Sequence, residues 1–276
     1  MARELILDDY EVGEFSALAA QFPADRFGYV VTPNVDHLVR YFSDRRFKDL
    51  YAAAAFVLLD SRFLGRIVAL TRGQRLRVCP GSDLTVQLLC QMSGSDERIV
   101  LVGATPEQAR QLTTRFWLRN LVHINPPMGF VRQPAQLERC LRDIEAAGPF
   151  RYCFLAVGSP QQEEVAFQLR ERGRARGLAL CVGASANFLT GVERRAPRFM
   201  QRWGLEWLFR LLQNPRKMAG RYLVRGPRIF RLLPQLEFRP RRRLAVVAGA
   251  GPRGLPATRR RALDTSGTFA PTRAQG

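Results

Sequence analysis

Polar side chains directly follow several apolar runs that are typical of β-strands. Asp60 comes after FVLL, Thr32 and Asn34 come after FGYVV, and Gln162 and Glu163 come after FLAVGSPQ. Ligands of open α/β sheets bind beyond the carboxyl ends of the strands, so these side chains are candidates for a single site. A carboxylate at the mouth of such a site can act as a general base, because partial burial tunes its pKa.

A simpler structural explanation exists for most of these residues. Asn34 and Asp60 both precede segments with helical patterns, and their side chains could cap the first backbone N–H groups of those helices. Glu163 lies in a first helical turn, where a carboxylate complements the helix dipole. Gln162 carries both a donor and an acceptor that could bind a base or a sugar. Both explanations stay open on the residues alone.

Glycines at strand ends offer places where a ligand could approach the backbone. Gly103 follows RIVLV and Gly158 follows FLAV, and neither has a side chain that would keep a phosphate away. The segment CPGSDL (79–84) begins a helix whose free N–H groups could receive a phosphate, although Ser82 or Asp83 could merely cap that helix. No GxxxxGK[ST] motif occurs, and the one GxGxxG match, GAGPRG (249–254), lies in the Gly- and Pro-rich sequence after residue 243 and follows none of the strand-like runs between 27 and 184, which argues against NAD and P-loop chemistry.

Other catalytic chemistries have little support in the sequence. His37 and His123 are the only histidines, and neither stands in a metal-ligand spacing. No GxSxG motif is present, which disfavours acyl hydrolysis. The five cysteines are scattered without CxxC spacing and are expected to be reduced core residues. We therefore expect no bound metal and no cofactor.

A parallel sheet is needed to hold the candidate site. Near-continuous apolar runs typical of strands alternate with amphipathic segments typical of helices, and no internal repeat occurs. The runs cover residues 27–32, 54–60, 98–104, 121–125, 151–158 and 178–184. This alternation predicts an α/β fold, a Rossmann-like parallel sheet with helices on both faces.

The character of the sequence changes after about residue 191. One amphipathic helix is expected over 198–212, ended by Pro215 and followed by shorter helical pieces. We predict a Rossmann-like domain over 1–195, an arginine-rich amphipathic appendage over 196–243, and a mostly disordered tail over 244–276. The tryptophans of the appendage are typical of a face that docks on the domain, and the arginines beside them leave a membrane-surface role open.

The charge of the chain points to an anionic partner. The formal net charge is +19, and Lys48 and Lys217 are the only lysines. Such an arginine bias can come from a GC-rich genome, so the position of the charge is more informative than its size. Residues 216–243 contain ten basic residues and one acid, which favours nucleic acid, anionic lipid headgroups or diphosphates. No apolar run approaches 18 residues, and the N-terminus lacks a signal pattern, so a cytosolic protein is expected.

Taken in order, these segments resemble the WecG/TagA/CpsF bacterial glycosyltransferases, glycosyltransferase family 26. The resemblance covers roughly Phe27 to Tyr222. The segments that carry it are TPN (32–34), PGSDL (80–84), VGA (102–104) with the helix expected after it, NPPMGF (125–130), GSPQQE (158–163), GASANFLTG (183–191), RAP (195–197), GLEWLFRL (204–211), NPRK (214–217) and RYL (221–223).

The resemblance implies a reaction and a place in the cell. A sugar of the N-acetylmannosamine, N-acetylmannosaminuronic acid or glucose type would pass from a UDP-sugar to a polyprenyl-diphosphate-linked saccharide, with inversion and without a metal. The product would serve surface polysaccharide or teichoic acid assembly. The enzyme would associate peripherally with the anionic inner face of the cell membrane, and it could form homo-oligomers.

The resemblance also implies roles for particular residues. Asp60 matches the catalytic aspartate of the family, and Thr32 and Asn34 match its TPN turn. The other expected substrate contacts are Gly103, Gly158, Gln162, Glu163, Asn187 and Arg195 in the domain, and Arg210, Arg216, Arg221 and Arg225 in the appendage.

Two positions depart from the family pattern. Family members usually have Gly after the aspartate where this chain has Ser61, and they commonly have Asp where this chain has Asn187. A serine restricts φ, so the loop after Asp60 can differ in shape. The loss of charge at Asn187 bears on recognition of the donor more than on the type of reaction.

Two functions other than sugar transfer are also compatible with the sequence. A nucleic-acid-binding protein would use the high positive charge, but the basic residues show no recognised nucleic-acid motif and are not interleaved with aromatics on a sheet face. A degenerate family member could instead organise a polysaccharide-synthesis complex or bind a membrane without catalysis. Ser61 and Asn187 favour that reading, and Asp60, Asn34 and Gln162 oppose it.

Overall fold

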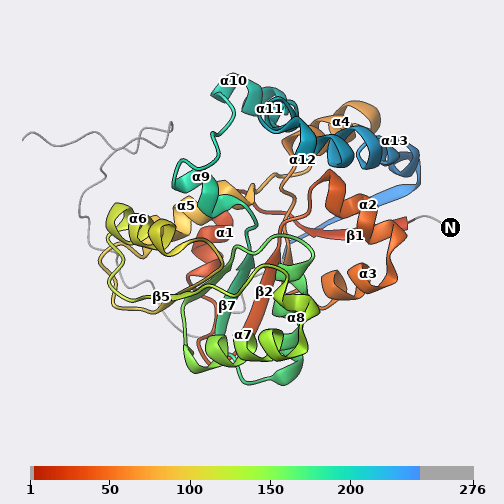
Figure 1. The fold of residues 1–276 in the computed structure, drawn as a ribbon. Coiled ribbons are helices and arrows are strands. Elements are labelled where there is room, and N and C mark those ends of the chain that lie inside the picture. The colour runs from red at the N-terminus through yellow and green to blue at the C-terminus, as the bar shows by residue number, and fades with distance from the viewer. Residues whose placement is uncertain (1–2, 243–276) are drawn as a thin grey trace, which may run out of the picture. The chain divides into compact units, whose positions relative to one another are not determined.

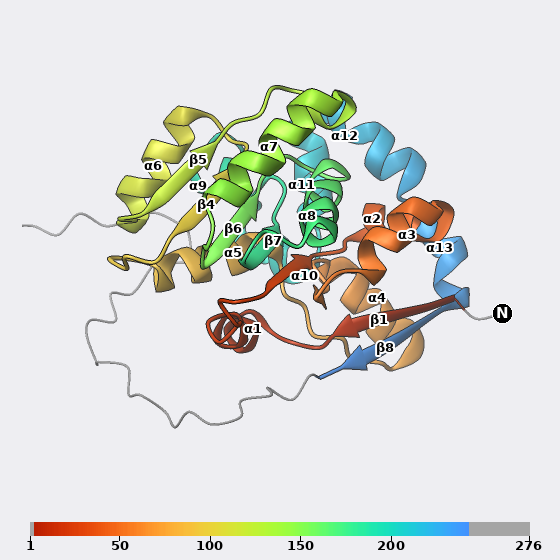
Figure 2. The ribbon, with the colours of Figure 1, turned by 90° about the horizontal axis from the view of Figure 1, so that it is seen from below.

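A six-stranded, all-parallel sheet forms the centre of the fold. The computed structural model describes residues 3–242. The strand order is β3-β2-β7-β6-β4-β5; Figure 1 shows β2 beside β7, and Figure 2 shows β7, β6, β4 and β5 in succession. The strands are β2 (Phe27–Val31), β3 (Phe56–Val57), β4 (Ile99–Val102), β5 (Leu121–Ile124), β6 (Tyr152–Leu155) and β7 (Gly177–Cys181). The predicted parallel sheet is confirmed.

Helices cover both faces of this sheet, as predicted (Figures 1 and 2). On one face lie α2 (Val35–Ser43), α3 (Arg45–Ala52), α7 (Pro134–Ala146) and α8 (Gln161–Arg172). On the other lie α1 (Val12–Ala19), α5 (Gly81–Gln91), α6 (Pro106–Phe116) and α9 (Ser185–Leu189). Successive strand residues alternate between the two cores: Leu155 packs in the first and Phe154 in the second, as the twofold period of a strand requires.

The expected strand over 54–60 is wrong in extent, because only Phe56 and Val57 form a strand. Beyond them the chain still follows its neighbour for a few residues. The backbone N–H of Leu58 donates to Val31 O, and that of Asp60 donates to Pro33 O, each at 2.9 Å. Asp60 therefore lies past the sheet edge, beside the turn that follows β2.

A second, two-stranded parallel sheet joins the ends of the described chain, and neither of its strands is predicted from the sequence. β1 (Arg3–Asp8) pairs with β8 (Leu236–Arg241), as Figure 2 shows. Leu5, Leu7 and Phe238 of these strands pack in the same core as one face of the main sheet.

The C-terminal segment folds as several short helices rather than one long one. These are α10 (Arg198–Trp203), α11 (Glu206–Gln213), α12 (Pro215–Ala219), a π-helical turn (Gly220–Arg225), α13 (Arg228–Leu232) and a 3₁₀ turn (Leu233–Gln235). The single helix expected over 198–212 is wrong, because the chain breaks at Gly204. This residue has a φ of +72°, and a Cβ there would lie 2.9 Å from the backbone of Phe63.

The helix α4 (Arg62–Arg72) lies beside the C-terminal segment, and Arg66 donates to the backbone carbonyl of Arg202. No helix of the described residues is both long and apolar enough to cross a membrane. The domain boundaries expected at 195 and 243 stay predictions, and the tail expected over 244–276 lies outside the described residues.

Asp8 joins three strands and is almost completely buried. Its Oδ2 accepts from the backbone N–H of Val57 at 2.8 Å, and both its oxygens accept from Arg241 at 3.0 and 3.1 Å. A buried carboxylate is stable in a fold only when its lone pairs are satisfied in this way. Asp8 therefore links β1 and β8 to the edge strand β3 of the main sheet.

Replacing Asp8 with Ala should lower the free energy of unfolding by about 2–3 kcal/mol, because charge-assisted hydrogen bonds to a buried group are lost. Urea denaturation of the full chain measures this change. Glu4→Ala on the same strand is the control, since Glu4 pairs with Arg239 at 3.3 Å but is exposed, and it should cost less than about 1 kcal/mol. Equal losses for the two variants would contradict the linking role of Asp8.

Candidate functional site

Two adjoining cavities open where the carboxyl ends of β2, β6 and β7 meet the C-terminal helices. The polar cavity has a volume of about 470 Å³ and is lined by Thr32, Arg40, Gly81, Ser82, Gly158, Gln162, Asn187, Glu193 and Arg195, among others. The apolar cavity has a volume of about 420 Å³ and is lined by Val35, Phe63, Trp207, Tyr222, Leu223, Ile229 and Phe230, among others. Both are lined by Asn34, Asp36, Asp60, Glu206, Arg210 and Arg221.

Asp60 lies at the junction of the two cavities and is half-buried. Its Oδ1 accepts from the backbone N–H of Gly81 at 2.8 Å, so the carboxylate caps the N-terminus of α5 rather than the helix that follows Asp60 in sequence. That following helix, α4, is capped by Ser61, whose Oγ accepts from Leu64 N. Ser61, which departs from the family pattern, therefore caps α4.

Burial raises the pKa of Asp60 above its ordinary value of 3.8. The hydrogen bond from Gly81 and the positive charge of Arg210 lower the pKa, but they do not cancel the effect of burial. A raised carboxyl pKa brings a general base closer to the pH at which it must take up a proton. Asp60 thus combines a position at the junction of the two cavities with a raised pKa.

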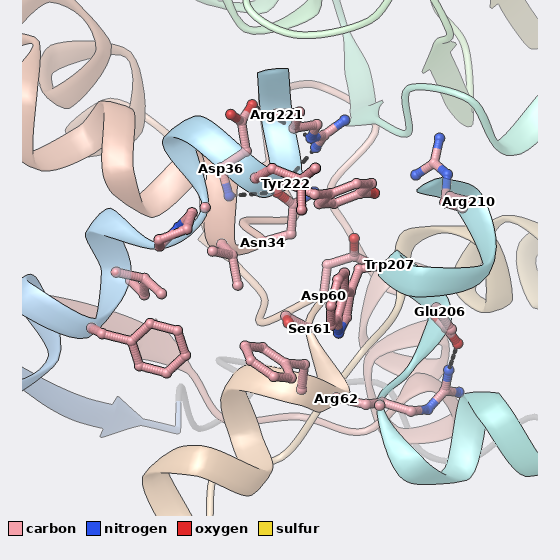
Figure 3. Close-up of a pocket in the computed structure, with 18 residues that line it drawn as sticks. Asn34, Asp36, Asp60, Ser61, Arg62, Glu206, Trp207, Arg210, Arg221 and Tyr222 are labelled. Carbon is pink, nitrogen blue, oxygen red and sulfur yellow. Dashed lines mark hydrogen bonds and ion pairs between the residues drawn. The ribbon is translucent and has the colours of Figure 1, made fainter. Parts of the chain in front are cut away.

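Glu206 is a second carboxylate at the same junction (Figure 3). Burial raises its pKa, Arg62 counteracts this, and the nearby charge of Asp60 raises the pKa further. Arg62 binds Glu206 and Asp83 at 2.6 Å each, and Arg195 binds the other oxygen of Asp83. This chain of ion pairs ties α11 to the N-termini of α4 and α5.

Thr32 and Asn34 hold the turn after β2. The hydroxyl of Thr32 donates to Cys181 O at 3.2 Å, which joins β2 to β7 at the floor of the polar cavity. Asn34 Oδ1 accepts from Asp36 N at 3.1 Å and His37 N at 3.4 Å, so the helix-capping explanation of Asn34 is confirmed. The same oxygen accepts from Arg221 at 3.1 Å.

Asp36 is the anchor of the π-helical turn and is almost completely buried. It pairs with Arg40 at 2.8 Å, Arg225 at 3.0 Å and Arg221 at 3.6 Å. Burial alone would raise the pKa of Asp36, but Arg221, Arg225 and Arg40 together outweigh it and lower the pKa. The carboxylate is therefore ionised at neutral pH, and it holds two arginines of the C-terminal segment beside the cavities.

His37 stays neutral within this cluster of charges. Burial lowers its pKa to about 3, and the nearby positive charge of Arg221 contributes. Its Nδ1 accepts from the backbone N–H of Asn34 at 3.2 Å, which only a neutral ring can do. His37 thus completes the cap of α2.

Gln162 and Glu163 bind to each other in the first turn of α8, and both are buried. Gln162 Nε2 donates to Glu163 Oε1 at 3.0 Å, and Gln162 Oε1 accepts from Gly183 N at 2.8 Å. Burial raises the pKa of Glu163. Gly158 lies on the same wall of the polar cavity with a φ of +80°, a conformation that glycine adopts easily.

Asn187 faces the polar cavity within a short polar chain. Its Oδ1 accepts from Gln108 at 2.9 Å, and its Nδ2 donates to Glu193 at 3.3 Å. Glu193 also accepts from Arg210 at 3.5 Å, and the Arg210 guanidinium lies 5.2 Å from the centroid of the Phe188 ring. An amide suits Asn187 because it must both accept and donate, which an ionised aspartate cannot do.

Three predicted binding residues lie away from both cavities. Gly103 packs against the backbone of Ala156, where a Cβ would lie 3.1 Å from that carbonyl group. Its φ of +86° gives a second structural reason for glycine. Arg225 binds Asp36 instead of lining a cavity, and Arg216 is exposed. Roles for these three residues in binding stay predictions.

The structure adds three residues that the sequence did not single out, namely Asp36, Arg62 and Glu206. Each makes an ion pair with a residue far away in the chain, so no local motif signals it. Asp36 stands two residues after the TPN turn, and Glu206 lies within GLEWLFRL. Within residues 3–242, no three His, Cys, Asp or Glu side chains are placed to hold a metal ion.

Residues 7–243 match the model of the glycosyl transferase WecG/TagA/CpsF family. The match covers most of the chain, including every cavity-lining residue described above, and the chain belongs to this family. It is therefore a glycosyltransferase of cell-surface polysaccharide synthesis, as the resemblance implies.

Asp36→Asn should release the π-helical turn, because three arginines then face one another without a carboxylate. We expect hydrogen exchange of the backbone across residues 220–232 to accelerate at least about tenfold, the effect of losing one charge-assisted hydrogen bond. Asp143→Asn is the control, since Asp143 makes a loose pair with Arg139 at 3.9 Å on α7. Unchanged exchange in Asp36→Asn would rule out the anchoring role.

Proposed function

We propose that this member of the WecG/TagA/CpsF family transfers a sugar from a UDP-sugar to a polyprenyl-diphosphate-linked saccharide, with inversion of the anomeric centre. The donor sugar is of the N-acetylmannosamine, N-acetylmannosaminuronic acid or glucose type. The observation that carries the proposal is the position of Asp60, on the wall that the polar and apolar cavities share. A group there can contact two substrates that enter from different sides.

Asp60 serves as the general base in this proposal. The acceptor hydroxyl attacks the anomeric carbon, and its proton passes to the carboxylate as the new C–O bond forms. The bond from the anomeric carbon to the diphosphate oxygen breaks, and its electron pair leaves with UDP. The hydrogen bond from Gly81 N–H holds Oδ1 of Asp60, which keeps the carboxylate oriented toward the cavities.

Arginines around the polar cavity support its assignment to the donor. Arg40 and Arg195 line it and do not line the apolar cavity, and a leaving diphosphate needs donors that are in place before charge develops. Arginine presents five N–H donors in a planar fork that matches phosphate oxygens. Gln162 and Asn187 also line this cavity, and their neutral amides are suited to contact the sugar or the base.

The surface of the C-terminal segment supports peripheral association with a membrane. Large apolar side chains there are exposed, and arginines lie among them. The exposed apolar residues are Phe199, Trp203, Leu212, Leu223, Val224 and Phe230. Apolar side chains beside cationic ones bind the interface of an anionic bilayer. A lipid-linked acceptor would be presented at that interface.

Asp60→Asn tests the assignment of the base. We expect UDP release with a suitable UDP-sugar and acceptor to fall by about 10²–10⁴-fold, the usual contribution of a general base. Asp44→Asn is the matched control, because Asp44 also caps a helix, accepting from Arg46 N at 2.9 Å, and does not line either cavity. A folded Asp60→Asn protein that turns over at the wild-type rate would remove the proposal.

The same substitution should stabilise the fold at neutral pH. The pKa of Asp60 is higher in the folded protein than its ordinary value, so folding disfavours the ionised form and stability falls as the pH rises through that pKa. Asn keeps an acceptor for Gly81 N–H and carries no charge. Thermal melting should therefore show a higher Tm for Asp60→Asn at pH 8, with a smaller difference near pH 4. Asp44→Asn should show no such gain.

A further inference from the structure

The role proposed for Asp60 as a base does not explain why one of the two cavities has apolar walls. Phe63, Trp207 and Tyr222 form a continuous aromatic side, with ring centroids 6.1 Å apart in each successive pair. Ile229 lies behind them and is buried, and Phe230 forms an exposed part of the rim. A saccharide needs hydrogen-bonding partners, and this part of the cavity has few to offer.

We propose that the apolar cavity binds the first isoprene units of the acceptor's prenyl chain, those nearest to the diphosphate. The proposal rests on the proposed function, because it takes a lipid-linked diphosphate as the acceptor. It adds that the enzyme draws the start of the chain out of the bilayer into a protein site. The lipid is then recognised as a lipid, and not only through its headgroup.

The charges at the mouth of the cavity match such a ligand. Arg210 and Arg221 lie where the apolar and polar cavities meet, so a diphosphate there would have hydrocarbon on one side and sugar on the other. Each guanidinium has five N–H donors. The hydrogen bonds to Glu193 and Asn34 use Nη2 of each, and Nε of Arg221 faces Asp36 at 3.6 Å. Both arginines therefore have donors left for phosphate oxygens.

The dimensions and rigidity of the cavity also fit a short branched hydrocarbon. Its volume of about 420 Å³ lies within the range of about 300–1,000 Å³ that is usual for small-molecule sites. Gly204 lets the chain turn between α10 and α11 against the backbone of Phe63, which places Trp207 on the wall. Aromatic side chains have few rotamers, so they form such a wall at little entropic cost.

The main alternative to a bound prenyl chain is that these apolar side chains contact the surface of a bilayer. Phe199 and Phe230 are similarly exposed, at 63% and 57%, and both belong to the C-terminal segment. Only Phe230 lines the apolar cavity. If the apolar side chains served only to touch lipid, the two phenylalanines would be equivalent, so this pair separates a binding site from a membrane contact.

Binding of soluble prenyl diphosphates in the absence of detergent and vesicles tests the proposal. Dimethylallyl, geranyl and farnesyl diphosphate carry one, two and three isoprene units, and calorimetry of the full-length protein gives their Kd values. We expect Kd to fall at least about tenfold with each of the first added units, because one methylene in an apolar pocket already accounts for about that factor. Farnesol should bind more weakly than farnesyl diphosphate, since Arg210 and Arg221 lose their anion.

Phe230→Ala and Phe199→Ala are the matched variants. Phe230→Ala should reduce the dependence of Kd on chain length, whereas Phe199→Ala should retain the wild-type series. Both proteins are checked by thermal melting and by their mass in solution. A wild-type Kd that does not change with chain length would overturn the proposal. So would equal effects of the two variants, or a dimer that Phe230→Ala dissociates, since a second copy would then occupy the cavity.

The binding series is independent of turnover. If Kd depends on chain length but the enzyme transfers sugar to no acceptor, the prenyl site is supported and the proposed function is removed. If the enzyme transfers sugar to a prenyl-diphosphate acceptor but Kd does not depend on chain length, the proposed function is supported and the prenyl site is removed.

Discussion

Keeping a carboxylate half-buried at the mouth of a parallel sheet is the constraint on which this structure depends. Burial opposes the charge of Asp60, and the N–H group of Gly81 and the positive charges of Arg210 and Arg62 favour it. The first comes from the same sheet edge, but Arg210 is supplied by a segment 150 residues later in the chain. The candidate site therefore needs the C-terminal helices as much as it needs the sheet.

Ion pairs that span the molecule bring those helices to the sheet. Asp36 holds Arg221 and Arg225, and Arg62 holds Glu206. These partners are buried or half-buried, so they are less screened by salt than surface pairs. The same contacts enclose the apolar cavity and place its arginines beside the polar one. The C-terminal segment thus forms part of the wall of both cavities.

The sheet could be predicted from sequence because its signals are local. Apolar runs and the residues that end them lie together in the chain, so the positions of Asp60 and Asn34 at strand ends follow directly. The strands β1 and β8 each pair with a segment more than 200 residues away, which no local pattern reveals. The break at Gly204 depends on contact with the backbone of Phe63. The position of Glu206 likewise depends on its ion pair with Arg62, which lies 144 residues away in the chain.

A ternary complex with UDP and an acceptor analogue tests the central claim most directly. Its crystal structure measures the distance from the attacking hydroxyl of the acceptor to the carboxylates at the junction of the two cavities. We expect this hydroxyl to lie about 2.6–3.2 Å from an oxygen of Asp60, the range in which a base takes up a proton. We also expect UDP to lie in the polar cavity. A hydroxyl that instead faces Glu206, or UDP in the apolar cavity, would contradict these expectations.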